Sequence, residues 1–172
     1  MAQERTDVVT FGSKPVTLIG PELKVGDTAP DVQVQANDLS MVSLGDFAGK
    51  VRLISVVPSL DTGVCDAQTR RFNEEAAGLG DHVAVLTISA DLPFAQKRWC
   101  GAAGIEQVQV LSDHLGMEFG AAYGTWIKEL RLESRAVFVV DANDKIAYAQ
   151  YVPAVGSHPD YDSAIAAAKA AQ

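Results

Sequence analysis

A cysteine at the end of an apolar segment has the position and neighbours of a nucleophile. Residues 51–57 are rich in valine and isoleucine, which is typical of a strand buried on both faces of a sheet, and Pro58 ends this run. Thr62 can cap a helix, because its hydroxyl can accept a hydrogen bond from a free backbone N–H group. Cys65 follows at the third helical position, where the helix dipole favours negative charge. We therefore expect the reactive thiolate form of this cysteine to be stabilised.

The alternative is that Cys65 is a structural residue. Free cysteine is among the most buried residue types and packs as a small hydrophobic side chain. The neighbours of Cys65 favour the reactive interpretation, because a threonine hydroxyl lies one turn away, Gly63 follows the cap and Pro58 closes the strand. These residues predict a polar pocket at a strand-to-helix junction.

The pattern of the whole chain predicts an α/β fold that can position this junction. Apolar β-branched runs alternate with helical patterns, so we expect a central mixed sheet with helices on both faces and an N-terminal β-hairpin, in a single domain spanning residues 1–172. The expected strands are 8–11, 15–19, 32–36, 41–44, 51–57, 83–89, 108–111, 136–140 and 146–152. The expected helices are a single turn at 45–50, a helix from Thr62 to Gly78 and Gly80, one capped by Asp91 with Pro93 in its first turn and broken by Gly101 and Gly104, and helices at 115–123 and 161–170.

Composition restricts the partners and the compartment. The net charge of −8 over 172 residues argues against a nucleic acid or an anionic membrane surface, so we expect a small-molecule or protein ligand. No segment has the features of a signal peptide or the length of a membrane span, and we expect a cytoplasmic protein. In that compartment two cysteines favour catalysis or redox chemistry over a structural disulfide. Zinc is disfavoured, because the cysteines and the three histidines lack paired-ligand spacing.

Two segments carry a resemblance to a known family. The spacing Pro58-x-x-x-Thr62-x-x-Cys65 is similar to the active-site signature of the peroxiredoxins, which adds an arginine from a later strand, and Arg135 matches that place. The longer segments 58–65 and 89–96, PSLDTGVC and SADLPFAQ, followed by Cys100, resemble the thiol peroxidases, the atypical two-cysteine subfamily of bacterial peroxiredoxins. The likeness extends nearly end to end and implies a thioredoxin-like fold.

The resemblance implies an enzyme that reduces hydrogen peroxide and organic hydroperoxides. Cys65 would be the peroxidatic cysteine and Cys100 the resolving one, which forms an intramolecular disulfide with it. Thr62 would align the peroxide, Arg135 would stabilise the leaving oxygen, and Pro58 would shape the pocket. The family also implies thioredoxin as the electron donor, a homodimer, and no metal or organic cofactor.

Other interpretations of these residues remain open. Cys100 could serve only in helix packing, and an arginine at the start of a strand is commonly a solvated side chain, with Arg131 as a nearby competitor for the role of Arg135. A thioredoxin-like disulfide reductase would need a Cys-x-x-Cys pair, which the chain lacks. A redox sensor that uses Cys65 and Cys100 as a switch is a further alternative, which repeated turnover of hydroperoxide would distinguish from an enzyme.

Overall fold

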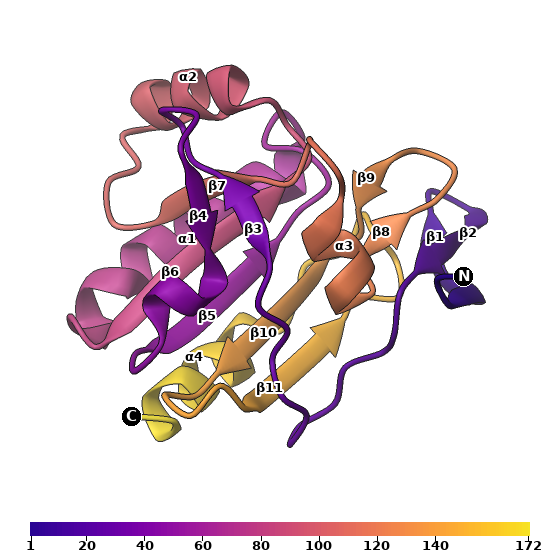
Figure 1. Cartoon of the computed structure of the whole chain (residues 1–172). Coiled ribbons are helices and arrows are strands. Elements are labelled where there is room, and N and C mark those ends of the chain that lie inside the picture. The colour runs from indigo at the N-terminus through magenta and orange to yellow at the C-terminus, as the bar shows by residue number, and fades with distance from the viewer.

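The computed structural model, which describes residues 1–172, contains a seven-stranded mixed sheet (Figure 1). Three central strands, β5, β6 and β7, are parallel, and the outer strands are antiparallel to their neighbours. The strand order is β11-β10-β5-β6-β7-β3-β4. The strands are β3 (Gln33–Gln35), β4 (Met41–Ser43), β5 (Val51–Val56), β6 (Val83–Ser89), β7 (Gln109–Ser112), β10 (Ala136–Val140) and β11 (Ile146–Tyr151).

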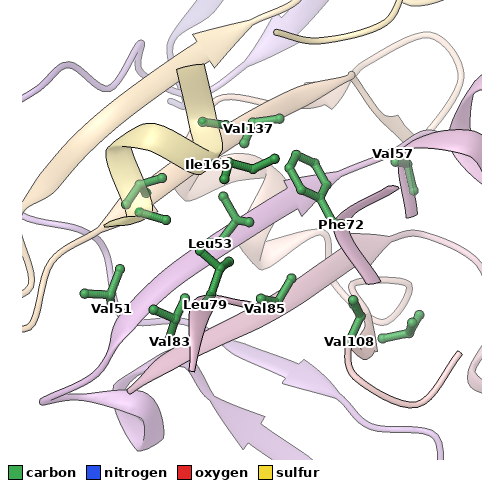
Figure 2. Packing of buried hydrophobic residues seen from close by; sticks show 14 of the residues in the cluster. Val51, Leu53, Val57, Phe72, Leu79, Val83, Val85, Val108, Val137 and Ile165 are labelled. Carbon is green, nitrogen blue, oxygen red and sulfur yellow. The ribbon is translucent and has the colours of Figure 1, made fainter. Parts of the chain in front are cut away.

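Helices cover both faces of this sheet, as the sequence predicts. The helices are α1 (Gly63–Leu79), α2 (Pro93–Ala103), α3 (Glu118–Tyr123) and α4 (Tyr161–Ala170), with one short 3-10 helix, η1 (Leu44–Phe47). Alternate residues of β5 point to opposite faces: Leu53 packs in the cluster beneath α1 and α4, and Ile54 packs with Phe119 of α3. Figure 2 shows the first cluster, in which Phe72 of α1 and Ile165 of α4 lie over the β5 side chains.

A second, smaller sheet contains the N-terminal hairpin. The hairpin strands β1 (Glu4–Phe11) and β2 (Lys14–Ile19) confirm the predicted hairpin, and they lie beside β8 (Trp126–Ile127) and β9 (Leu132–Glu133) (Figure 1). The sequence analysis did not anticipate β8 and β9, because a two-residue strand is too short to show an alternating pattern.

Several predicted helix boundaries are wrong for identifiable reasons. Gly78 and Gly101 lie inside α1 and α2, because a helical glycine costs only about 1 kcal/mol, which packing can offset. The two helices end at Gly80 and Gly104, the second glycine predicted for each end, whose φ angles of 84° and 66° lie outside the range of a right-handed helix. Leu92, and not Asp91, is the N-cap residue of α2.

The predicted helix at 115–123 is also too long. It begins only at Glu118, because the preceding Met117 has a left-handed backbone with φ of 53°. The carboxylate of Asp113 accepts hydrogen bonds from the N–H groups of Phe119 and Gly120 at 3.0 and 2.9 Å, and these bonds satisfy two donors of the first turn.

Candidate active site

Cys65 occupies the first turn of α1, three residues after the N-cap Thr62, as the sequence predicts. Its side chain is fully buried (0% exposed) and lies at the end of the apolar cluster between α1 and the sheet. Pro58 lies in the loop after β5, and the helix begins after Thr62, whose backbone is extended as in an N-cap residue. The thiol is free, at the positive end of a 17-residue helix.

The Thr62 hydroxyl contacts the Cys65 sulfur and does not cap the helix backbone, which corrects the expected capping bond. Its Oγ1 lies 2.7 Å from Sγ of Cys65 and 3.0 Å from the carbonyl oxygen of Ser59. A hydroxyl has one proton, so it can donate to only one of these two acceptors at a time. It can donate to the carbonyl while the thiol is protonated and donate to the sulfur once the thiolate forms.

Arg135 approaches the same sulfur from the other side. It immediately precedes β10, is 2% exposed, and places Nη2 3.2 Å from Sγ of Cys65. Its Nε donates to the carbonyl oxygen of Val155 at 2.7 Å, and its Nη1 donates to Oε1 of Gln68 at 2.9 Å. Three hydrogen bonds thus fix the guanidinium beside the sulfur. The competing Arg131 lies elsewhere and donates to the carbonyl oxygen of His114.

Gln68 is a member of this site that the sequence analysis did not identify. It is fully buried, accepts from Arg135, and donates through Nε2 to the Ser55 hydroxyl at 2.7 Å. The spacing from Cys65 to Gln68 was the available signal, because residues three apart share a helix face. Gln68 therefore links the guanidinium to the central strand β5.

A pocket of about 210 Å³ opens beside the two side chains that contact the Cys65 sulfur. Thr62 and Arg135, the two side chains that contact Sγ, both line it. Pro58 forms part of the wall, where the sequence analysis places it. The other lining residues are Phe11, Gly12, Gly63, Val64, Val155 and Gly156. The pocket therefore has polar groups at the sulfur and apolar side chains around them.

Cys100 lies on α2 as a second free thiol and packs against the cluster that contains Cys65. It is half-buried and lines a separate cavity of about 660 Å³ together with Asn37, which belongs to the loop between β3 and β4. Burial raises the pKa of the Cys100 thiol, and the neighbouring Asn37 side chain partly opposes this rise. The two cysteines are thus placed on neighbouring helices of one face, one enclosed and one partly accessible.

The structure contains no group of three or more His, Cys, Asp or Glu side chains that could hold a metal ion. None of its helices combines the length and the apolar character that crossing a bilayer requires.

The chain is similar to known proteins of one family. The model of the family described as Redoxin matches residues 24–165. The chain is 65% identical over 163 residues to a protein named thiol peroxidase from Halalkalibacterium halodurans, covering 95% of this chain and 98% of that one. It is 64% identical to a thiol peroxidase from Bacillus subtilis, with coverage of 94% and 96%. Among solved structures, a peroxiredoxin-like protein from Aquifex aeolicus superposes with a TM-score of 0.90 at 41% identity, with 99% of each chain covered.

Proposed function

The chain belongs to the Redoxin family and is an enzyme of its thiol peroxidase group, and on this premise we propose that it reduces hydroperoxides through a Cys65 thiolate and resolves the product through Cys100. The family and the thioredoxin-like fold implied by the sequence resemblance are both confirmed. The observation that carries the proposed mechanism is the double contact at one buried sulfur, by the Thr62 hydroxyl and the Arg135 guanidinium.

In the first step Sγ of Cys65 attacks the terminal oxygen of the hydroperoxide. The O–O bond breaks, the sulfur becomes a sulfenic acid, and the leaving alkoxide or hydroxide takes a proton to form alcohol or water. Arg135 stabilises the charge on the leaving oxygen, because its donors are already held in place by Gln68 and Val155. The Thr62 hydroxyl aligns the peroxide beside the sulfur.

In the second step the Cys100 thiolate attacks the sulfenic sulfur. The S–O bond breaks, hydroxide leaves and is protonated to water, and a Cys65–Cys100 disulfide forms. Because Cys65 is fully enclosed, the loop before it or the first turn of α1 must open to admit the second sulfur. A thioredoxin dithiol then supplies the two electrons that restore both thiols.

The pocket supports organic hydroperoxides as better substrates than hydrogen peroxide. Phe11, Val64 and Val155 give it apolar walls, and an alkyl tail gains about 0.8 kcal/mol for each methylene that it buries. We expect a larger kcat/KM for cumene hydroperoxide than for hydrogen peroxide, and equal values would contradict this preference.

The decisive experiment supplies the enzyme with thioredoxin, thioredoxin reductase and NADPH. Many equivalents of hydroperoxide should be consumed, whereas a redox sensor would be oxidised once. Cys65→Ser should abolish consumption, and Cys100→Ser should reduce one equivalent and stop as a sulfenic acid. Continued thioredoxin-linked turnover by Cys100→Ser would show that Cys100 is not the resolving residue.

The family resemblance also supports a proposal for the assembly. The whole chain, residues 1–172, would fold as one domain and associate as a homodimer in the cytoplasm. Light scattering of the purified enzyme at micromolar concentration tests the dimer, and a monomer mass would contradict it.

A further inference from the structure

The two sequence segments that resemble thiol peroxidases are hydrogen-bonded to each other through Asp91. This residue follows β6, just before α2, while Ser59 and Leu60 belong to the loop that leads to Cys65. Oδ1 of Asp91 accepts from the Ser59 hydroxyl at 2.7 Å, and Oδ2 accepts from the backbone N–H of Leu60 at 2.8 Å. Oδ2 also accepts from the Ser89 hydroxyl at 2.8 Å, within its own segment. One carboxylate thus connects the Cys65 loop to the start of the helix that carries Cys100.

This connection continues to the reactive sulfur. The carbonyl oxygen of Ser59 accepts from both the N–H and the hydroxyl of Thr62, at 3.2 and 3.0 Å. The same hydroxyl contacts Sγ of Cys65. Asp91 therefore holds Ser59, Ser59 holds Thr62, and Thr62 orients the sulfur. Asp91 itself touches neither the sulfur nor the substrate pocket.

We propose that Asp91 is a positioning residue that keeps the Cys65 loop closed and thereby sets how fast the oxidised Cys65 reaches Cys100. The proposal rests on the two-cysteine function given above. Closure holds Thr62 against the sulfur for the first step, but the second step requires the loop to open. The bonds from Ser59 and Leu60 to Asp91 cross between the two segments and must break or shift for that opening. The bond from Ser89 does not cross and can persist.

The Asp91 bonds thus determine which fate of the sulfenic acid is faster. While the loop is closed, the sulfenic acid stays in the peroxide pocket and can react with a second hydroperoxide to form sulfinic acid. When the loop opens, Cys100 can attack instead. Weakening the crossing bonds should therefore speed disulfide formation and lower the yield of sulfinic acid.

The test compares variants that cut the crossing bonds with one that does not. Ser59→Ala removes one crossing bond, and Asp91→Asn removes the charge and one acceptor oxygen. Ser89→Ala removes no crossing bond: its hydroxyl donates to Asp91 and accepts from the Asp91 N–H and the Gln96 side chain, all on its own side of the connection. Rapid mixing with cumene hydroperoxide, followed by Trp99 fluorescence, separates the first step from disulfide formation, because Trp99 lies beside Thr62 and Gly63. Mass spectrometry measures the sulfinic acid.

Ser59→Ala and Asp91→Asn should each form disulfide about tenfold faster, the change expected when a hydrogen bond to a carboxylate is lost. The first step should change by less than about twofold, because the closed state still predominates. The double variant Ser59→Ala/Asp91→Asn should form disulfide little faster than either single variant, because both changes weaken the same connection between the two segments. Ser89→Ala should match the wild type. If Asp91→Asn does not fold, Ser59→Ala alone decides the question.

Disulfide formation at the wild-type rate in Ser59→Ala, or equal acceleration in Ser89→Ala, would overturn the proposal. An independent arm uses no peroxide: amide hydrogen exchange of Leu60 in the reduced enzyme should be faster in Ser59→Ala and Asp91→Asn. Unchanged exchange would also overturn it. If the wild type formed no disulfide between Cys65 and Cys100, the proposed function would fail instead, and the Leu60 exchange rate would still decide whether Asp91 closes the loop.

Discussion

Arg135 contacts the Cys65 sulfur through one nitrogen while its other nitrogens are held by protein acceptors. Replacing it with Met should remove a fixed charge and donor from the reacting oxygens and slow the first step by about 100-fold or more. Lysine should recover only part of the rate, since a point charge cannot reproduce a planar fork of donors. Stopped-flow measurement with excess hydroperoxide gives the rate constant. Arg131→Met, a change at an exposed arginine, is the matched control and should react at the wild-type rate.

Asn37 should control the reactivity of Cys100. Burial raises the pKa of this thiol above its ordinary value of 9.0, so at pH 7 little thiolate is present and disulfide formation should speed up as pH rises. Asn37→Leu removes the polar side chain that lowers this pKa, so the rate of disulfide formation at pH 8 should fall and its increase should occur at a higher pH. The alkylation rate of Cys100 in a Cys65→Ser background measures the effect without peroxide.

The matched control for Asn37 is Gln35→Ala. It removes the bonds from the Gln35 side chain to the carbonyl oxygen of Leu39 in the same hairpin and to the His114 ring, but leaves the Asn37 amide in place. If this control slowed alkylation as much as Asn37→Leu, the shape of the hairpin, and not the amide, would be responsible.

The types and spacing of these residues predicted part of the site. The position of Cys65 in α1 follows from local cap and strand signals, which a sequence displays directly. The partner of the Thr62 hydroxyl does not follow from such signals. A hydroxyl near the start of a helix can bond to the backbone or to a side chain, and only tertiary packing decides between them. The spacing of Gln68 places it on the helix face of Cys65, but its partner Arg135 is distant in sequence, as is Leu60 from Asp91, and no local pattern displays such pairs.

At the scale of elements, the first turn of α1 must be both a rigid frame for the sulfur and a segment that can open. Gly63 begins the helix, and a Cβ atom added there would meet nothing within 4 Å. Gly63→Ala should therefore stabilise the closed turn by up to about 1 kcal/mol. It should leave the first step unchanged, slow disulfide formation and raise the yield of sulfinic acid, the opposite of the effect expected for Ser59→Ala.

Rapid mixing and mass analysis of Gly63→Ala measure both quantities. A wild-type rate of disulfide formation with no added overoxidation would mean that opening at Gly63 does not limit resolution. Gly78→Ala, near the other end of α1 and equally open around its Cβ position, is the control for a general increase in helix stability.

The elements whose bounds the sequence predicts well are those with a strong apolar pattern. The strands β5, β6 and β10 and the helix α4 match their predicted bounds closely, because each is a run with a strong apolar pattern. The start of α2 was assigned to Asp91 because aspartate is a common cap. Its carboxylate instead binds Leu60 on another loop, a tertiary contact that a propensity cannot reveal.

At the scale of the whole molecule, one buried acid should make stability depend on pH. Glu133 of β9 is fully buried, and burial, together with a hydrogen bond and the charge of the neighbouring Asp113, raises its pKa well above the ordinary value of 4.5. The folded state therefore keeps a proton that the unfolded chain releases. The contribution of protonated Glu133 to the free energy of unfolding is fully present below pH 4.5, and it declines as pH rises toward the folded-state pKa of this residue.

Glu133→Gln should flatten this part of the stability profile, since an amide does not titrate. The free energy of unfolding, measured by urea at about pH 5 and pH 9, should fall less with pH in the variant than in the wild type. An equal fall in both proteins would show that Glu133 does not cause the dependence. Glu118→Gln, at an exposed position on α3, is the control for the loss of one negative charge.

The N-terminal hairpin has a consequence for how this enzyme could diversify. Phe11 and Gly12 at its turn form one wall of the substrate pocket, and Thr10 is hydrogen-bonded to the segment at Pro153 and Val155. The residues that would break the O–O bond lie in the first turn of α1, at its cap and immediately before β10. Mutations in the hairpin turn could therefore widen, narrow or recharge the entrance while the chemistry is inherited intact. Under selection for activity on a new hydroperoxide, substitutions in the first dozen residues would change the pocket entrance without changing the catalytic residues.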